Sequence, residues 1–323
     1  MNSADVVRLD SEKPVKSFKP DTKSFWWKLK NQKQLAFMSV PILFYIVLFA
    51  YVPTLGWVMA FQNFQPAKGF FKSAWLGLYN FKMLFADPDF YRDFRNTLCM
   101  SALNIVFSFA AAIILALLLN EIKNVFFKRT IQTISYLPHF LSWVIVSSLV
   151  VTTLSVDGIL NDILVGIGII NQPVVWLGHG NYFWGILTVT NVWKEVGWNT
   201  IIYLAAMAAI DPALYEAAVM DGASRFQKMK YITLPGIKTT FVILLIMSIG
   251  WIMEAGFEPQ YLLRNGLNVD YAETIDLYVI KYGFQQSNFS LATAAGIFRS
   301  VINIVMLFAA NFVAKKTTDE RLI

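Results

Sequence analysis

Long apolar stretches separated by short polar segments make up most of the chain. A helix that crosses a hydrocarbon core of about 30 Å needs about 20 apolar residues, because each helical residue advances the chain by about 1.5 Å. The pattern therefore predicts an all-α integral membrane protein with six transmembrane helices, of which the fifth is the shortest. The predicted spans cover approximately residues 37–61, 97–119, 131–154, 182–210, 237–253 and 291–313.

The composition agrees with a membrane protein and offers little for metal chemistry. Hydrophobic residues make up 56% of the 323 residues and charged residues 15%, whereas soluble proteins carry roughly 25% charged residues. The single cysteine, Cys99, cannot form an internal disulfide, and the two histidines, His139 and His179, are far apart and lack neighbouring carboxylate or thiolate ligands. We therefore expect no metal site and no cofactor bound by this chain.

Basic residues predict the orientation of the chain in the membrane. With the N-terminus inside, the inner segments carry eighteen Lys and Arg residues and the outer segments carry seven. Because cytoplasmic loops are enriched in Lys and Arg, both termini are predicted to be cytoplasmic. The predicted organisation is a basic tail at residues 1–34, a transmembrane domain at residues 35–314 with a cytoplasmic hairpin at residues 211–236, and a short tail at residues 315–323.

Residues 211–236 carry local signals for two helices joined by a turn. Asp211, which a proline follows, is a favourable N-cap. Gly222 stands where a left-handed residue would end the first helix. Ser224 and Gln227 have the spacing of a capping box for the second helix, which Pro235 is expected to limit. The segment is therefore predicted to be a helical hairpin at the membrane surface.

The same segment contains the order Glu-Ala-Ala, three residues, Gly, nine residues, Ile-x-Leu-Pro. This order resembles the EAA signature of binding-protein-dependent ABC importer permeases, and every fixed position is matched. The resemblance implies the six-helix fold of a type I ABC importer permease, in which this hairpin is the coupling helix that docks in a groove of an ATPase subunit. The matching residues are Glu216, Ala217, Ala218, Gly222, Ile232, Leu234 and Pro235.

The resemblance also implies partners. It predicts a heterodimer with a second, related permease, two copies of a cytoplasmic ABC ATPase that bind ATP and Mg²⁺, and an extracytoplasmic solute-binding protein. The chain itself has no Walker A loop and no hydrolase motif, so we expect a non-catalytic translocation subunit of the bacterial cytoplasmic membrane. The residues expected to couple to the ATPase are Glu216, Ala217, Ala218, Asp221, Gly222, Ala223, Arg225 and Phe226.

A second match lies just after the first predicted span. Gly77, Leu78, Asn80 and Phe81 are similar to a Gly-Leu-x-Asn-Phe sequence of the oligosaccharide branch of this family, the branch of the maltose permease. The function that this resemblance implies is ATP-driven import of a saccharide, and specifically an oligosaccharide, that the solute-binding protein delivers.

Polar residues within the fourth predicted span are candidates for the substrate pathway. Asn191, Lys194, Glu195 and Trp198 follow the i, i+3, i+4, i+7 spacing of one helix face. Ionisable groups at membrane depth are costly and are usually functional. Two interpretations remain open: this face lines a water-filled cavity, or its charged residues form an ion pair with another helix or a polar contact with a partner subunit.

Two neighbouring spans extend the predicted pathway. In the third, Pro138 predicts a kink, and in the fifth, polar and aromatic residues recur every three positions. Aromatic faces beside hydrogen-bonding groups suit a polyhydroxylated ligand, and the resemblance to the maltose permease suggests, by position only, that these spans contact the sugar. The candidate residues are His139, Ser142, Trp143, Ser248, Trp251 and Glu254.

The ligand and its driving force leave alternatives open. An acidic saccharide would suit Lys194 and Arg299, but the nearby Glu195 and Glu254 argue against it. Lys194 and Glu195 could instead serve as an ion relay in an ion-coupled secondary transporter or channel. A third possibility is a membrane scaffold that binds an ATPase and moves no solute.

Three segments are predicted to lie outside the membrane, at residues 62–96, 155–181 and 255–290. The first contains interfacial aromatic residues. In the second, the apolar run 159–170 is too short to span the bilayer and is predicted to be an interfacial or re-entrant helix. In the third, Arg264-Asn265-Gly266 predicts a turn.

Overall fold

The computed structural model describes residues 33–318, and the chain divides into two units between Leu55 and Gly56. In the described part of the first unit the chain is helical throughout. Helix α2 (Lys33–Ile46) continues through a π turn, η1 (Val47–Tyr51), into η2 (Val52–Phe61), which crosses the division. Apolar side chains are exposed along this helix, as expected for the first span. Residues 1–32 of the predicted N-terminal tail, and residues 319–323, lie outside the described residues.

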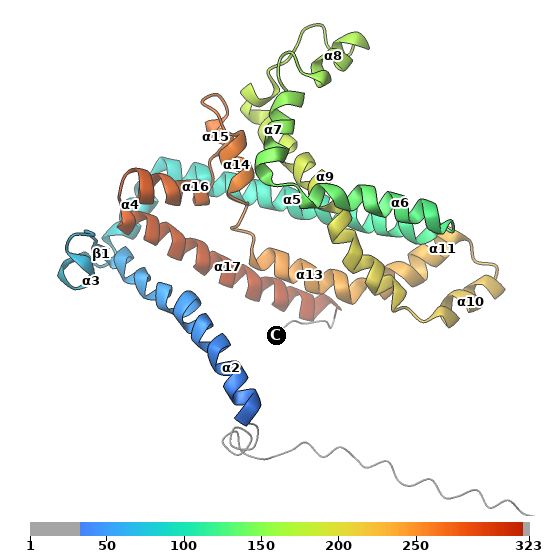
Figure 1. Ribbon diagram of the computed structural model, residues 1–323, viewed down its shortest axis with the longest axis horizontal. Coiled ribbons are helices and arrows are strands. Elements are labelled where there is room, and N and C mark those ends of the chain that lie inside the picture. The colour runs from blue at the N-terminus through green and yellow to red at the C-terminus, as the bar shows by residue number, and fades with distance from the viewer. Residues whose placement is uncertain (1–32, 319–323) are drawn as a thin grey trace, which may run out of the picture. The chain divides into compact units, whose positions relative to one another are not determined.

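Two helix pairs form the centre of the second unit. Helix α5 (Pro88–Glu121) packs along α9 (Gly180–Ala208), and α13 (Lys238–Gly250) packs along α17 (Phe289–Thr318) (Figure 1). Helix α5 begins where Asp87 caps it, because the Asp87 carboxylate accepts a hydrogen bond from the backbone N–H of Asp89 at 3.0 Å.

Small residues allow the central helices to approach one another closely. Ala112 and Ala116 of α5 pack against Tyr203 and Met207 of α9 and against Ile237, which precedes α13. Since lipid tails are as apolar as these side chains, close van der Waals packing of small residues is the main attraction between such helices. A second buried cluster joins α4, α5 and α17 to the outer segments and includes Leu84, Phe90, Met253, Ile275, Tyr278, Leu291 and Ala295.

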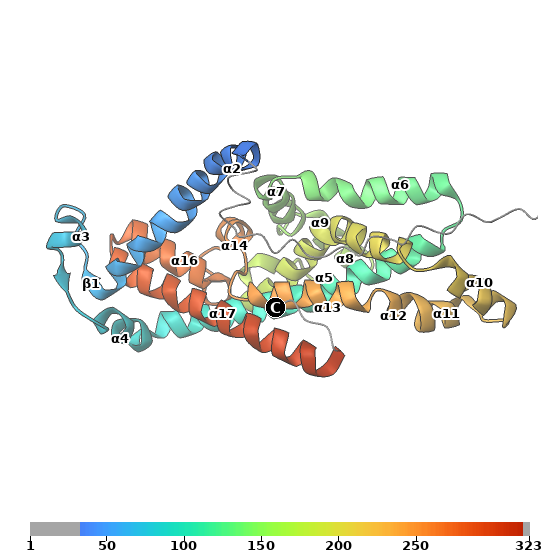
Figure 2. The same cartoon turned by 90° about the horizontal axis from the view of Figure 1, so that it is seen from below.

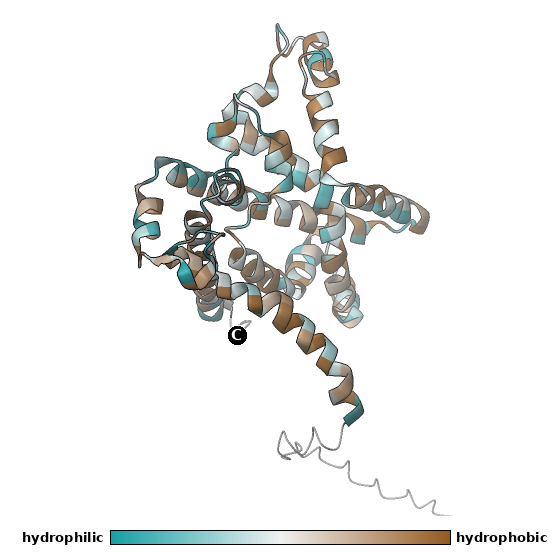
Figure 3. Ribbon diagram, turned by 60° about the vertical axis from the view of Figure 1, so that its left-hand side comes forward, coloured by the Kyte–Doolittle hydropathy of each residue, from teal (hydrophilic) through white to brown (hydrophobic). Residues whose placement is uncertain are grey.

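Helix length and composition agree with a membrane protein. Among residues 33–318, three helices are long and apolar enough to cross a membrane, or up to six if each bent pair counts as one span. Apolar residues predominate along α2, whereas polar residues gather in the connecting loops (Figure 3). The three bent pairs turn by 100°, 71° and 54° at breaks of at most four residues.

The third predicted span is broken rather than only kinked. Helix α6 (Val125–Tyr136) and the 3₁₀ turn η3 (Leu137–Phe140) are followed by α7 (Trp143–Thr153) at an angle of 100°. Pro138 lies in the 3₁₀ turn, and the chain becomes extended at Leu141. The kink predicted from Pro138 in the span over residues 131–154 is therefore a full break of 100°.

The segment after the first span forms a small folded hairpin. Strand β1 (Gln62–Asn63) pairs antiparallel with β2 (Ala74–Trp75), and α3 (Gly69–Lys72) lies between them. Helix α4 (Tyr79–Ala86) follows.

The Gly-Leu-x-Asn-Phe sequence joins this hairpin to α4. Gly77 has a φ of 56°, a left-handed backbone that glycine adopts without steric cost. The buried Asn80 side-chain amide donates to the carbonyl oxygens of Ala60 at 2.8 Å and Gln62 at 3.0 Å. The sequence therefore fixes the end of the first span to the hairpin.

The second outer segment is organised by one buried side chain. The Asn161 amide donates to the carbonyl oxygens of Ser155, Val156 and Val174 and accepts from the Trp176 indole N–H. Helix α8 (Ile159–Gly166) is shorter than the predicted run 159–170 and is followed by the 3₁₀ turn η4 (Trp176–Gly178).

The third outer segment packs on the start of α5. The Asn96 amide donates to the carbonyl oxygens of Asp270 and Glu273, each at 2.9 Å, and the backbone N–H of Ile275 donates to the Thr97 hydroxyl. A turn at the predicted Arg264-Asn265-Gly266 is confirmed, since the Asn265 carboxamide accepts from the Leu267 N–H. The elements here are α14 (Glu258–Leu263), α15 (Val269–Ala272), α16 (Ile275–Ile280) and the π turn η6 (Lys281–Gln285).

Candidate functional site

The first helix of the predicted coupling hairpin is α10 (Pro212–Met220). The Asp211 carboxylate accepts a hydrogen bond from the backbone N–H of Ala213 at 2.9 Å, so the predicted N-cap is confirmed. Gly222 has a φ of 74°, and the helix end closes when the Ala223 N–H donates to the Ala218 carbonyl oxygen at 2.8 Å. Glycine suits this position because its left-handed backbone carries no steric cost there.

The second helix begins with the predicted capping box. The Ser224 hydroxyl accepts from the Gln227 N–H at 3.3 Å, and the Gln227 side chain accepts from the Ser224 N–H at 2.7 Å. Helix α11 (Arg225–Lys228) follows. Both predicted helices of the hairpin are therefore present.

The second helix extends one residue past the limit predicted at Pro235 and ends at Gly236. The helix continues from α11 through a π turn, η5 (Met229–Thr233), into α12 (Leu234–Gly236). A proline ring normally collides with the carbonyl four residues earlier, but the extra residue of a π turn changes that register. The helix therefore passes Pro235 and bends by 54° only after Gly236.

The hairpin lies at one end of the second unit (Figures 1 and 2). It exposes both apolar and charged residues. The Tyr215 and Thr233 hydroxyls are hydrogen-bonded at 2.9 Å and brace the two helices. Met220 is an exposed apolar residue that the predicted coupling set did not include. Of the predicted set, Ala218 and Ala223 are half-buried, and the exposed members are Glu216, Ala217, Asp221, Gly222, Arg225 and Phe226.

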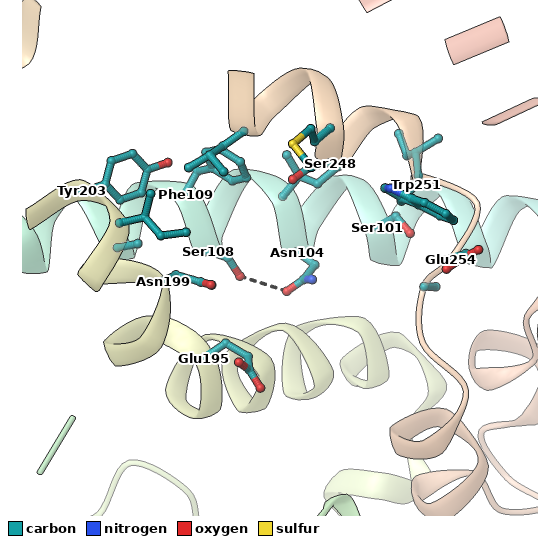
Figure 4. Close-up of a pocket in the computed structure, with 17 residues that line it drawn as sticks. Ser101, Asn104, Ser108, Phe109, Glu195, Asn199, Tyr203, Ser248, Trp251 and Glu254 are labelled. Atoms are coloured by element: carbon teal, nitrogen blue, oxygen red, sulfur yellow. Dashed lines mark hydrogen bonds between the residues drawn. The ribbon is translucent and has the colours of Figure 1, made fainter. Parts of the chain in front are cut away.

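A cavity of about 430 Å³ lies between α5, α9 and α13 (Figure 4). Its wall mixes aromatic and hydrogen-bonding side chains, and the Trp251 side chain is 61% exposed. The Ser108 hydroxyl donates to the Asn104 carboxamide oxygen at 3.0 Å. The polar and aromatic residues of the wall are Ser101, Asn104, Ser108, Phe109, Glu195, Asn199, Tyr203, Ser248, Trp251 and Glu254.

Four of the predicted pathway residues line this cavity, namely Glu195, Ser248, Trp251 and Glu254. Sequence reasoning missed the contribution of α5. Its signal was present, because Ser101, Asn104 and Ser108 follow the i, i+3, i+7 spacing of one helix face within an apolar span. Small polar residues are a weak signal within an apolar span. The prediction therefore relied on the ionisable residues of the fourth span.

The other predicted pathway residues gather around the break in the third span. Lys194 is buried, with 5% of the residue exposed. Its ammonium donates to the His139 carbonyl oxygen at 2.8 Å and to Glu195 Oε1 at 3.0 Å. His139 Nδ1 lies 2.6 Å from Glu195 Oε2, and the His139 ring stacks on Trp198 at 4.3 Å. Lys194 and Glu195, neighbours on α9, therefore pair with each other, and both also contact His139 across the break.

Further contacts fix the same break. The Lys194 ammonium lies 5.4 Å from the centre of the Trp143 ring, within the range of a cation–π interaction. The Ser142 hydroxyl caps α7 by accepting from the Ile145 N–H at 3.4 Å. Asn191 is half-buried on α9, one turn before Lys194. We name the group of His139, Lys194, Glu195 and Trp198 the break cluster.

Glu254, on the wall after α13, has a looser environment than Glu195. Arg299 Nη2 lies 3.8 Å from Glu254 Oε1, while Arg299 Nη1 bonds the Asp276 carboxylate of α16. Burial raises the pKa of the Asp276 carboxyl above its ordinary value, although the Arg299 charge opposes the shift. Both carboxylates on the cavity wall, Glu195 and Glu254, therefore have a basic partner, Lys194 and Arg299 respectively.

Within residues 33–318 no group of three or more His, Cys, Asp or Glu side chains could hold a metal ion.

Comparison with known proteins identifies the family. The model of the binding-protein-dependent transport system inner membrane component matches residues 108–319. Protein LplB of Bacillus subtilis (strain 168) is 43% identical over 295 residues, which are 91% of this chain and 92% of that protein. The polygalacturonan/rhamnogalacturonan transport system permease protein YteP of the same organism is 46% identical over 294 residues, 91% of each chain.

Solved structures agree with this family. One chain in the crystal structure of a bacterial ABC transporter involved in the import of the acidic polysaccharide alginate matches with a TM-score of 0.83 and 39% identity, covering 91% of this chain and 99% of that one. A chain of the bacterial alginate ABC transporter in complex with its alginate pentasaccharide-bound periplasmic protein gives 0.85 and 38%, covering 93% and 100%. The chain therefore belongs to the family of binding-protein-dependent transport system inner membrane components.

Proposed function

We propose that this chain is one transmembrane subunit of an ATP-driven importer for an oligosaccharide that contains uronic acid residues. The match to the alginate importer, over 91% of the chain at 39% identity, is the observation that carries the proposal. The permease YteP, named for polygalacturonan and rhamnogalacturonan transport, supports the same acidic class at 46% identity. Alginate and polygalacturonan both consist of uronic acid units, so the shared ligand chemistry is a sugar ring that bears a carboxylate.

The cavity supports a saccharide ligand. Its volume of about 430 Å³ falls in the range of about 300–1,000 Å³ that is usual for small-molecule sites. Trp251 offers an aromatic face to a sugar ring, and Asn104 and Asn199 offer both donors and acceptors to its hydroxyls.

The carboxylates on the cavity wall are compatible with an acidic ligand. Lys194 holds Glu195, and Arg299 lies beside Glu254, so neither carboxylate acts as an uncompensated negative charge. Repulsion of a uronate by Glu195 and Glu254 is therefore largely offset by their basic partners.

Transport would be driven through the hairpin at residues 211–236. The hairpin would dock on an ATPase subunit with Met220 and Phe226 as apolar contacts and Arg225 as a charged contact, since all three are exposed. A second permease, two ATPase subunits that bind ATP and Mg²⁺, and an extracytoplasmic solute-binding protein would complete the importer. Both termini and the hairpin would lie in the cytoplasm, as the distribution of basic residues predicts.

The ligand class is tested on the reconstituted importer with its own solute-binding protein. ATP hydrolysis is measured with the binding protein loaded with an oligogalacturonate or with a neutral oligosaccharide of the same length. We expect stimulation by the acidic ligand alone. Equal stimulation by both ligands would remove the uronate requirement, and stimulation by neither would remove the saccharide assignment.

The coupling role is tested at Gly222, whose φ of 74° suits glycine. A left-handed backbone costs a β-branched residue about 1–2 kcal/mol, so Gly222→Val should distort the turn and uncouple ATP hydrolysis from uptake. Gly222→Asn is the matched control, because asparagine tolerates this backbone. Unchanged coupling in Gly222→Val would contradict the lever role.

The ion-coupled alternative predicts a different response. An ion relay through Lys194 and Glu195 would make uptake sensitive to ionophores and independent of any ATPase. Family membership favours the binding-protein-dependent importer, and the two side chains are already paired with each other and with His139.

A further inference from the structure

The β1–β2 hairpin with its connection to α4, residues 62–79, buries two polar side chains and exposes several large apolar ones. The polar side chains of Gln62 and Ser73 are buried, whereas Trp75 and Leu78 are exposed and Phe71 is fully exposed. Polar residues are mostly found on the surface of water-soluble proteins. Asn63, Gln65, Lys68 and Lys72 are exposed as well, so the outside of the hairpin is mixed, and its large exposed apolar side chains suit a boundary between water and an apolar environment.

The buried polar side chains satisfy the backbone of the hairpin. The Gln62 amide donates to the Phe70 carbonyl oxygen at 2.9 Å, and the Ser73 hydroxyl donates to the Gly69 carbonyl oxygen at 2.7 Å. The Ser73 hydroxyl also accepts from the Gln65 N–H at 3.2 Å. Backbone groups that leave water must find partners within the protein, so these bonds suit a segment that enters a membrane.

The depth of the hairpin follows from its connection to the chain. Strand β1 starts at Gln62, directly after η2 ends at Phe61, and the helix over Lys33–Phe61 is a candidate membrane span. This helix has 29 residues, more than the roughly 20 that cross a hydrocarbon core of about 30 Å, so the hairpin joined to its end lies in the interfacial region. Within the second unit, α3 and the hairpin formed by α10 and α11 lie at opposite ends (Figures 1 and 2).

The composition of the exposed surface fits phospholipids. Aromatic side chains are enriched at the membrane interface, where Trp and Tyr rings lie at headgroup level. Trp75 stacks on Phe61 at 5.7 Å, and Phe70 lies 5.1 Å from Phe64, so the hairpin carries two aromatic pairs. Lys68 and Lys72 are exposed on the same hairpin and can meet lipid phosphates.

We propose that the hairpin at residues 62–79 is a lipid-binding anchor that inserts Phe71 and Trp75 into the outer leaflet and places Lys68 and Lys72 among the phospholipid headgroups. The outer side rests on the cytoplasmic orientation of the coupling hairpin in the proposed function. Contact with lipid rests on the hairpin alone.

The test places an environment-sensitive NBD fluorophore at position 71. Phe71→Cys is made in a Cys99→Ser background, since Cys99 is the only cysteine of this chain, and is assembled with cysteine-free partner subunits. The complete importer is placed in nanodiscs of phosphatidylethanolamine and phosphatidylglycerol, with lipid brominated either near the headgroup or near the methyl end of the acyl chain. Gly266→Cys is the control, because a side chain there meets nothing within 4 Å.

Insertion of the anchor by about 5–10 Å predicts a definite quenching pattern. Lipid brominated near the headgroup should quench the label at position 71 about twofold, iodide should have little effect, and the label at position 266 should show the reverse. Quenching at position 71 by iodide instead of lipid would overturn the proposal. Protection from both quenchers would overturn it as well, because a protein partner would then cover the hairpin.

Sidedness is measured separately. A membrane-impermeant maleimide applied to intact cells should label Gly266→Cys. Labelling only after the membrane is opened would reverse the proposed orientation, yet the quenching at position 71 would still report whether the hairpin contacts lipid. The two failures are therefore distinguishable.

Discussion

Two carboxylates, Glu195 and Glu254, lie on the cavity wall (Figure 4). They differ in how firmly their partners hold them. Both oxygens of Glu195 have partners within 3.0 Å, Lys194 and His139. Glu254 has one basic neighbour, Arg299, at 3.8 Å, and that guanidinium also bonds Asp276. We infer that the wall at Glu195 is fixed by the break in the third span, whereas the wall at Glu254 can exchange its partner.

This difference has a functional consequence. A preorganised polar group orients a ligand at little entropic cost, so Glu195 is suited to position a sugar hydroxyl. A guanidinium shared between two carboxylates can turn toward a third, such as the carboxylate of a uronate. The fixed wall would then define orientation, and the adjustable wall would sense ligand charge.

The largest predicted effect is a loss of stability, caused by a substitution at a close backbone contact near Glu195 of the fixed wall. Gly197 of α9 packs so closely on α6 that an added Cβ would lie 2.1 Å from the Ser135 carbonyl oxygen. Gly197→Ala should therefore lower the free energy of unfolding by about 3 kcal/mol, the upper part of the usual overpacking range. The measurement is thermal unfolding of the purified importer.

A matched control lies on the same helix. Gly185→Ala adds the same methyl group where nothing lies within 4 Å, and it should leave the midpoint of unfolding nearly unchanged. Equal tolerance of both substitutions would mean that the crossing of α6 and α9 is not tight.

The second largest effect is expected when the cation of the break cluster is removed. Lys194→Met leaves the His139 carbonyl oxygen and Glu195 Oε1 without their donor. The loss should cost about 2 kcal/mol, as expected for unmet buried hydrogen-bonding groups, and should lower uptake at least tenfold. Uptake and unfolding are measured on the same preparation.

A double variant separates the ion pair from simple packing. Adding Glu195→Gln to Lys194→Met removes the uncompensated charge and should recover part of the stability, because the two effects are coupled. Strictly additive losses would show that Lys194 acts without Glu195.

A smaller and more selective effect is expected at the adjustable wall. Arg299→Gln removes the basic partner of Glu254 and Asp276. A partly exposed ion pair is worth about 1 kcal/mol or less, so the complex should stay folded, while KM for an acidic oligosaccharide should rise about fivefold. Loss of uptake with an unchanged KM would contradict charge sensing, and Glu254→Gln in the same background should restore KM.

The sequence predicts the coupling hairpin well because its signals are local. Asp211, Gly222 and the capping box at Ser224 act on residues within one helical turn. The helix nevertheless includes Pro235 and ends one residue later, because the preceding π turn changes which carbonyl the proline ring meets.

The break cluster shows where sequence reasoning stops. Helical spacing brought Lys194, Glu195 and Trp198 to one face, yet their partner His139 lies 55 or more residues away along the chain. The 100° break is held by that distant contact, and Pro138 alone could indicate only a kink. The α5 part of the cavity wall was missed for the same reason. It depends on which helices pack together, and that is set by residues far apart in the sequence.

The smallest predicted effect is the pH dependence at Asp276, the carboxylate of α16 that Arg299 also bonds. Burial raises the pKa of its carboxyl in the folded protein above the ordinary value of 3.8, with Arg299 opposing the shift. The folded state therefore holds this proton more tightly than the unfolded state, so stability falls as the pH rises above about 3.8 and levels off once the folded pKa is passed.

Asp276→Asn should remove this fall, so that the unfolding midpoint of the wild-type importer drops relative to the variant as the pH is raised from about 4. Arg299→Gln is the informative companion. Without the guanidinium the Asp276 pKa should rise further, and the fall should extend to higher pH. A wild-type midpoint that instead rises with pH relative to Asp276→Asn would mean that Arg299 outweighs burial. Arg299 would then be committed to Asp276 and unable to turn toward Glu254 or a ligand.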